Sequence, residues 1–337
     1  MKTGAFALGS RRIGEGEPCL VVAHVGTAHG GDADAALHLI EAAFQAGADA
    51  VAFPVFRAAD LVARRHPQRA ELEAAELSAR EWKKVLGAAK GSGLAVVAET
   101  FDTASRDLAA EAGVDAFQAH PTDLDHPELL RALAATGRPL LLGACGAEEP
   151  LVREALAAAG ETAALLVGPP LAPAAPEELR LAELASLRER YRVPTGLLDP
   201  TDGGSAFALL APALAAALGA DFVEKRIALD RTRKSRDWAA ALAPEDFYRM
   251  VELLRQAEQA RGGAEGHSRR TPARGRSIVA AGLIGRGETI TAERLVFKRT
   301  DERFERGLAP AEAHRVIGRR AARPIQADET IREDMLE

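Results

Sequence analysis

The sequence is poor in the residues that define several common protein classes. Its 337 residues include only two cysteines, Cys19 and Cys145, and aromatic residues make up 4%. Two cysteines cannot build a disulfide framework or a cysteine-rich zinc site, so a reduced, cytoplasmic setting fits best. There are 43 Lys and Arg against 49 Asp and Glu, giving a formal net charge of −6. A field of this sign does not hold nucleic acid or an anionic membrane surface.

Long hydrophobic runs are also missing. The first nine residues are too short and too interrupted to be the apolar core of a signal peptide. The most apolar stretch, residues 209–223, is broken by Pro212, Gly219 and Asp221, whereas a membrane helix needs about 20 apolar residues. We therefore expect no membrane segment and a small-molecule partner.

What the sequence does contain is a regular alternation of short apolar runs and alanine-rich segments with helical spacing. This alternation is typical of parallel strands joined by helices. Helical segments include residues 34–46, 78–91, 127–135 and 205–218. Eight strands are predicted, at residues 19–24, 50–55, 94–99, 115–119, 139–144, 163–168, 194–198 and 221–226.

Recurring turns support a closed barrel. Gly-Ala-Asp or Gly-Val-Asp precedes the strands at Asp49, Asp115 and Asp221, and such a glycine ends a helix in the left-handed conformation. No Gly-x-Gly-x-x-Gly motif follows the first strand, which disfavours an open dinucleotide-binding sheet. The pattern predicts an α/β fold, a (β/α)8 barrel, with residues 5–17 forming a hairpin that plugs its bottom.

The barrel pattern ends before the C-terminus. Residues 262–275 are rich in glycine and arginine and are predicted to be a linker between a barrel at 1–261 and a small unit at 276–337. Short strands are predicted in the small unit at 277–281, 287–290, 295–299 and 316–318. About 60 residues is small for an independent core, so we expect this unit to pack against another surface.

The residues that carry a family resemblance are spread along the chain. They are the opening 57 residues, Glu224-Lys225, Leu-Ala-Pro-Glu-Asp-Phe at 242–247, and the tail motifs Ser277-Ile278-Val279-Ala280, Gly287-Glu288-Thr289-Ile290 and Val316-Ile317-Gly318. Together they resemble the sialic acid synthase family, and the tail resembles the antifreeze-like SAF domain, a small mainly-β unit. The resemblance covers the chain nearly end to end.

The resemblance implies an enzyme of carbohydrate biosynthesis, a transferase that joins phosphoenolpyruvate to an N-acetylhexosamine such as N-acetylmannosamine. The product is a nine-carbon 2-keto sugar acid. It also implies a divalent metal, Mn or Mg, and a homodimer in which the SAF domain of one chain caps the barrel of the other. Such an exchange is consistent with a small domain that cannot bury itself.

Several positions depart from the family pattern. Pro200 and Arg226 stand where two histidines bind the metal, and Ala52 and Gln118 stand where two lysines bind phosphoenolpyruvate. His24 replaces the glutamate of the first strand that binds the sugar. Phosphoenolpyruvate is an anion whose binding needs cations, so the resemblance does not decide whether this chain carries out the condensation. The alternative is a non-catalytic paralogue that binds a sugar acid or pairs with an active synthase.

The family residues that this chain retains are mainly those that bind the sugar. By resemblance, Glu224, Asp237 and Arg299 hold the sugar, and His29 of the first loop is kept. From the chemistry of its guanidinium, Arg226 is a candidate to attract an anionic ligand, with a solvated charge at the barrel rim as the alternative. Without the resemblance, Glu224 reads as a salt-bridge residue and Arg299 as a solvated strand end. If the condensation is retained, catalysis is expected to rest on Glu224 with a substitute such as His24 and Asp199.

A relocated metal site is a further alternative. Barrel chemistry occurs at the C-terminal ends of the strands, and the residues expected to project there are His24, Glu99, His120, Cys145, Asp199 and Glu224. His24, Glu99 and His120 together offer ligands for zinc, iron or manganese and for different chemistry. No ligand-spacing motif joins them, and the two histidines also suit hydrogen-bonded loop edges.

Overall fold

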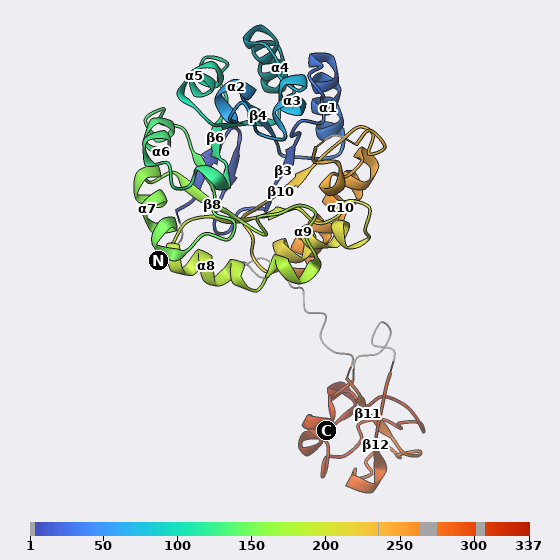
Figure 1. Ribbon diagram of the computed structural model, residues 1–337. Helices are drawn as coiled ribbons and strands as arrows, with labels where there is room; N and C mark the ends of the chain where they lie inside the picture. The colour runs from blue at the N-terminus through green and yellow to red at the C-terminus, as the bar shows by residue number, and fades with distance from the viewer. Residues whose placement is uncertain (1–3, 235, 263–274, 301–306) are drawn as a thin grey trace. The chain divides into compact units, whose positions relative to one another are not determined.

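A computed structural model describes residues 4–234, 236–262, 275–300 and 307–337 (Figure 1). The chain divides into two compact units, Met1–Glu265 and Gly266–Glu337. The predicted linker falls almost entirely outside the described residues. In the described part of the chain, no helix is both long and apolar enough to cross a membrane.

The first unit is a closed barrel of eight parallel strands, seen in Figure 1 as a ring inside the helices. The order around the barrel is β10-β3-β4-β5-β6-β7-β8-β9. Each strand begins and ends within one residue of its predicted position, so the predicted (β/α)8 fold is confirmed. The strands are β3 (Leu20–His24), β4 (Ala50–Val55), β5 (Ala95–Thr100), β6 (Ala116–Ala119), β7 (Leu140–Gly143), β8 (Ala163–Val167), β9 (Thr195–Asp199) and β10 (Phe222–Arg226).

The outer helices begin where the sequence offers caps. The Asp32 side chain accepts hydrogen bonds from the amides of Asp34 and Ala35 at the start of α1, and Ser78 forms a capping box with Glu81. Two short helices, α2 and α3, occupy the connection after β4. The helices are α1 (Ala33–Gln45), α2 (Ala58–Leu61), α3 (Arg69–Ala74), α4 (Ala79–Gly91), α5 (Thr103–Glu111), α6 (Pro127–Ala134), α7 (Glu149–Ala159), α8 (Glu183–Tyr191), α9 (Phe207–Ala217) and α10 (Pro244–Arg261).

The recurring Gly-x-Asp turns fasten neighbouring strands. Each glycine has a positive φ, as predicted. Each aspartate then accepts a backbone N–H from the preceding strand: Asp49 from Val21 at 2.9 Å, Asp115 from Val96 at 2.8 Å, and Asp221 from Thr195 at 2.9 Å. The same device therefore sets the register at the bottom of three strand pairs.

The barrel bottom is closed by the predicted hairpin. Strands β1 (Phe6–Leu8) and β2 (Arg11–Ile13) pair antiparallel, and Leu8 and Ile13 are fully buried in one cluster with barrel side chains such as Val22 and Phe222. A second, larger cluster fills the space between strands and helices and includes Leu197 and Val223. Alternation along a strand assigns each side chain to one of these two layers.

The C-terminal unit has its own core, which includes Ile278, Ile284 and Ile290. Strand β11 (Ser277–Ala280) pairs antiparallel with β12 (Leu295–Lys298). The predicted strands at 287–290 and 316–318 are wrong. The first is held by a single bridge from Thr289 to Arg320, and the second is a turn that ends at Gly318, where φ is +89°. Glycine-rich turns leave too few residues for strand pairing.

Candidate active site at the barrel mouth

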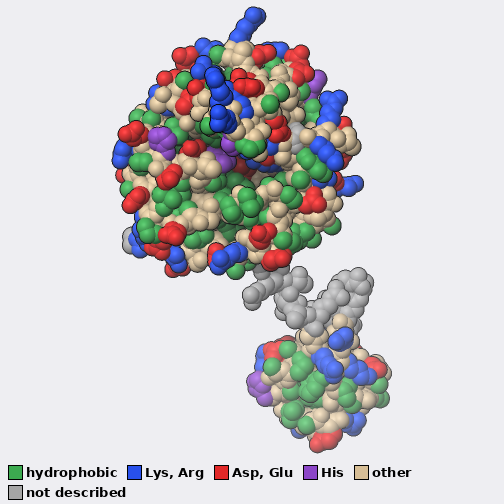
Figure 2. All heavy atoms as spheres, in the orientation of Figure 1, with side chains coloured by type: hydrophobic (Ala, Val, Ile, Leu, Met, Phe, Trp, Pro, Cys, Tyr) green, Lys and Arg blue, Asp and Glu red, His purple; other side chains and the backbone are tan. Residues whose placement is uncertain are grey.

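A cavity of about 410 Å³ lies at the C-terminal ends of the strands, where barrel proteins place their chemistry. In Figure 2 histidine side chains, in purple, lie beside a hollow near the centre of the barrel unit. We call this space the mouth cavity. Its polar lining is His24, Thr27, His66, Gln68, Glu99, His120, Thr122, Arg226, Arg236 and Asp237.

His24 ends β3 and is buried. Its Nδ1 lies 3.0 Å from the amide nitrogen of Gly26 and 3.2 Å from Nη1 of Arg226. An amide and a guanidinium can only donate, so Nδ1 accepts both hydrogen bonds and carries no proton. The imidazole proton of the neutral ring is then on Nε2, which lies 3.5 Å from Oε2 of Glu99. His24 is therefore held as a neutral ring between a cation and a carboxylate.

Glu99 is the last but one residue of β5, has the inward strand parity of Val97, and is 5% exposed. Burial alone raises its pKa, but the hydrogen bond from His24 and the nearby side chains of His120 and Arg226 hold the pKa of Glu99 below its usual range. The carboxylate is therefore ionised at neutral pH. It supplies a fixed negative charge at the floor of the mouth cavity.

Arg226 ends β10 and pairs with Asp237, with Nη1 and Oδ2 separated by 3.0 Å. Both side chains are about a quarter exposed, at 26% and 25%. Gly26 allows this pair to lie against the backbone of the first loop, since a Cβ there would come 2.7 Å from Nη1 and 3.1 Å from Oδ2. Its φ of +56° also favours glycine. Sequence inspection identified both charged residues, but not the glycine that lets them pack.

Glu224 lies one layer deeper and is 5% exposed. Burial raises its pKa, and a hydrogen bond with Gln118 opposes this effect. Among the described residues, Oε2 of Glu224 and Oε1 of Gln118 have no hydrogen-bond partner. The lumen therefore holds buried acceptors with unused capacity at the position where Gln118 replaces a lysine.

Asp199 and Lys225 lie on the other side of the barrel wall, which corrects the expectation that Asp199 projects into the mouth. Their side chains have the same strand parity as Leu197 and Val223, which pack against the helices. Asp199 Oδ2 lies 3.0 Å from Lys225 Nζ, and both side chains are fully buried. Thr201 completes this group by donating to Asp199 and accepting from Lys225.

His120 lines the mouth cavity, but its Nδ1 lies 2.7 Å from Thr122 Oγ1 and caps the short 3-10 helix Pro121–Asp123. Across the described ranges, no group of three or more His, Cys, Asp or Glu side chains is arranged to hold a metal ion. The predicted set of His24, Glu99 and His120 is therefore not assembled as a ligand set here.

Two further predicted residues lie elsewhere. His29 is 3% exposed and does not line the mouth cavity. Its ring meets that of Trp82 edge to face at 5.7 Å, and burial lowers the pKa of His29 to about 4. Arg299 follows β12 in the C-terminal unit and is exposed. Its predicted role in sugar binding stays a prediction.

The apolar wall of the mouth cavity was not predicted. Phe56 and Phe101 contribute to it, and Leu61, Val62 and Leu72 come from the segment that forms α2 and α3. A sequence signal was present, because residues 56–77 are too long for a simple strand-to-helix connection. The mouth cavity thus has a charged side from β3, β5 and β10 and an apolar side.

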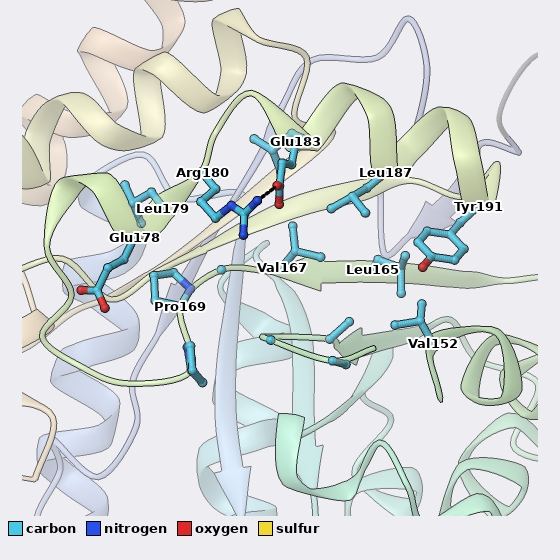
Figure 3. A pocket seen from close by; sticks show the side chains of 16 residues that line it. Val152, Leu165, Val167, Pro169, Glu178, Leu179, Arg180, Glu183, Leu187 and Tyr191 are labelled. Carbon is cyan, nitrogen blue, oxygen red and sulfur yellow. Dashed lines mark ion pairs between the residues drawn. The ribbon is translucent and has the colours of Figure 1, made fainter. Parts of the chain in front are cut away.

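A second cavity of about 480 Å³ lies outside the barrel lumen, between β8 and helices α7 and α8 (Figure 3). Figure 3 shows its lining of apolar side chains such as Val152, Leu165 and Leu187. Arg180 and Glu183, at its edge, form an ion pair with each other. The strand-end residues of the mouth do not reach this cavity.

The chain combines an eight-stranded barrel with a small C-terminal unit, and both parts match known families. The model of the NeuB family matches residues 39–266, and that of the SAF domain matches residues 275–337. The chain therefore belongs to the NeuB family, which contains sialic acid synthases and related enzymes.

Individual relatives agree with this assignment. An uncharacterized protein of Methanocaldococcus jannaschii is 30% identical, with 88% of this chain and 90% of that protein covered. The N,N'-diacetyllegionaminic acid synthase of Legionella pneumophila is 27% identical, with 96% of each covered. The solved structure of the spore coat polysaccharide biosynthesis protein SpsE from Bacillus subtilis has a TM-score of 0.68 and 26% identity, with 99% of each chain covered.

The residues present do not fit the divalent metal that the family resemblance implies. Arg226 and Pro200 occupy the two positions expected for histidine ligands, and neither side chain offers a lone pair to a metal. His24 Nδ1 already accepts two hydrogen bonds, and its other nitrogen faces Glu99. The mouth carries a guanidinium where a metal centre would need free ligands.

Proposed function

We propose that this NeuB-family protein binds an N-acylated sugar or the corresponding sugar acid in the mouth cavity, and that it does not use phosphoenolpyruvate. Asp237 and Glu99 line the cavity and supply acceptors that sugar hydroxyl groups need, and Arg226 supplies donors. Glu224, one layer deeper, is the proposed acceptor for a ligand group that reaches into the lumen. The apolar wall from Phe56 and Leu61 offers a surface for the acyl group or a ring face. A cavity of mixed polar and apolar lining is typical of small-molecule sites.

One observation supports the second half of this proposal: the two positions where the family resemblance places phosphoenolpyruvate-binding lysines hold uncharged residues. Ala52 and Gln118 replace the two lysines, and Gln118 hydrogen-bonds Glu224. Lys225 faces the opposite side of the wall and is paired with Asp199. An incoming phosphate would also meet the ionised Glu99 carboxylate at the mouth, and like charges repel strongly in a low-dielectric site.

Calorimetric titration tests both halves. N-acetylmannosamine and N-acetylneuraminate are titrated into the native chain, and phosphoenolpyruvate is titrated separately with and without Mn²⁺. We expect heat from at least one sugar and none from phosphoenolpyruvate. Asp237→Asn is expected to weaken sugar binding at least ~10-fold, which is the usual loss for one charge-assisted hydrogen bond. Asp107→Asn on exposed α5 is the matched control and should bind normally.

The predicted homodimer is part of the same proposal. The family resemblance implies that Arg299 of one chain serves the barrel of another. Sedimentation equilibrium gives the mass in solution, and mixing the Arg299→Ala and Asp237→Asn variants tests the exchange. If sites are shared between chains, a mixture that exchanges subunits regains a fraction of native sugar sites. A monomeric mass would contradict the dimer.

A further inference from the structure

The mouth cavity contains a charge arrangement that the family resemblance does not supply. Arg226 lies at the centre of it, with Nη1 held by Asp237 at 3.0 Å and by His24 at 3.2 Å. Within the described part of the chain, its Nε and Nη2 groups have no protein acceptor, and the side chain lines the cavity. One edge of the guanidinium is therefore fixed, and the other edge is free for a ligand.

The fixed edge makes Arg226 a preorganised cation. Asp237 and His24 restrain the same nitrogen from two elements, and His24 is in turn held by Gly26 and Glu99. Restraints of this kind reduce the rotamer entropy lost when a ligand binds. A planar guanidinium also presents two parallel N–H donors, which suits an oxygen acceptor such as a carboxylate or a carbonyl.

The two substitutions at this place compensate each other in charge. A strand-one carboxylate together with a divalent cation carries one net positive charge. A neutral His24 together with the Arg226 guanidinium also carries one net positive charge. An arginine at position 226 beside an unchanged strand-one carboxylate would have changed this net charge. Loss of the metal alone would also have changed it. The pair His24 and Arg226 therefore carries the same net charge as the carboxylate and metal that the family resemblance implies at these positions.

We infer that the Arg226 guanidinium is the resident cation of the mouth cavity, replaces the divalent metal, and binds an oxygen of the ligand without any metal. This inference rests on the proposed sugar-side function and deepens it. The ligand oxygen belongs either to a carboxylate, as in a sugar acid, or to a carbonyl, as in an N-acylated sugar. The two chemistries are separated by titrating N-acetylneuraminate and N-acetylmannosamine in parallel.

The first experiment measures metal. The full chain is dialysed against EDTA and titrated with Mn²⁺, while free Mn²⁺ is followed by its electron paramagnetic resonance signal. We expect no stoichiometric uptake. Uptake of about one Mn²⁺ per chain that is lost in His24→Ala would overturn the inference, whether or not any sugar binds. The Mn²⁺ titration therefore tests the role of Arg226 even if the proposed function fails, that is, if no sugar binds in calorimetry with or without metal.

The second experiment measures the sugar. Affinity is expected to be the same with EDTA and with Mn²⁺, to fall at least ~10-fold in Arg226→Gln, and to recover partly in Arg226→Lys. In Arg226→Ala, free guanidinium ion should restore binding and Mn²⁺ should not. Arg249→Gln, on an exposed arginine of α10, is the matched control. Binding that needs Mn²⁺, or that survives Arg226→Gln unchanged, would refute the role assigned to Arg226.

Discussion

Replacing Lys225 by methionine is expected to lower the free energy of unfolding by about 3–5 kcal/mol, because it leaves the Asp199 carboxylate buried without its cation. The two charged groups are 3.0 Å apart, and neither side chain is exposed. Asp199→Asn should cost a similar amount, since it leaves Lys225 with only the oxygens of Thr201. Neither change reaches the mouth cavity.

The double variant Lys225→Met, Asp199→Asn is the informative one. Removing both charges eliminates the unpaired buried ion, so the double variant should lose less stability than either single variant. Urea unfolding followed by circular dichroism measures all three, with the m-value checking that unfolding remains comparable. The exposed pair Lys84 and Asp34, at 2.8 Å, is the control, and Lys84→Met should leave the free energy of unfolding nearly unchanged because water and salt screen this pair.

The outcome also decides the role of Asp199. If the single losses simply add in the double variant, the buried pair does not exist as described. If Asp199→Asn abolishes sugar binding while the fold remains intact, Asp199 belongs to the site after all. We expect strong coupling between the two substitutions in the free energy of unfolding, and unchanged ligand affinity in every variant.

Three other predictions concern packing, pH and reactivity. Gly196→Ala should destabilise the barrel by about 1–3 kcal/mol, because a Cβ there would lie 2.6 Å from Phe222 ring atoms. The control Gly87→Ala, on the exposed side of α4, should stabilise it by about 0.5–1 kcal/mol. Equal effects of the two variants in urea unfolding would contradict this prediction. The pKa of His29 in the folded state, about 4, lies below its ordinary value of 6.5, so the folded protein should lose stability as pH falls from 6.5 towards 4. His29→Gln should lessen this loss when unfolding is measured across that pH range. An unchanged dependence of stability on pH in the variant would contradict the prediction. Burial raises the pKa of Cys145 to about 12, so iodoacetamide at pH 8 should label it only after unfolding, and rapid native labelling would refute this.

The barrel could be predicted from sequence because two independent signals agree. Apolar runs mark the strands, and the turns at Gly47, Gly113 and Gly219 mark where helices end. The C-terminal strands were harder to predict. Thr289 takes part in a single bridge, and Val316 lies in a turn, so a few β-branched residues were not evidence of pairing.

The site was predictable only in part, and strand parity explains the difference. His24, Glu99, Arg226 and Asp237 line one cavity. Barrel geometry predicted only His24 and Glu99 at this place, whereas Asp237 came from the family resemblance and Arg226 from its charge. Asp199 sits at a strand end too, but it is one residue past the inward-facing Leu198, so its side chain turns away. The neutral state of His24 follows from the donors of Gly26 and Arg226 that surround its Nδ1 atom, and the sequence does not reveal that these groups meet.

We propose above that the mouth cavity still binds a sugar although the residues that would bind phosphoenolpyruvate have been replaced. The most direct test is phosphate release from phosphoenolpyruvate, with N-acetylmannosamine and Mn²⁺, using the native chain at high concentration. We expect no release above the protein-free background, together with sugar binding by calorimetry in the same preparation. Sugar-dependent phosphate release that follows protein concentration would contradict it and would show that Ala52 and Gln118 do not prevent the condensation.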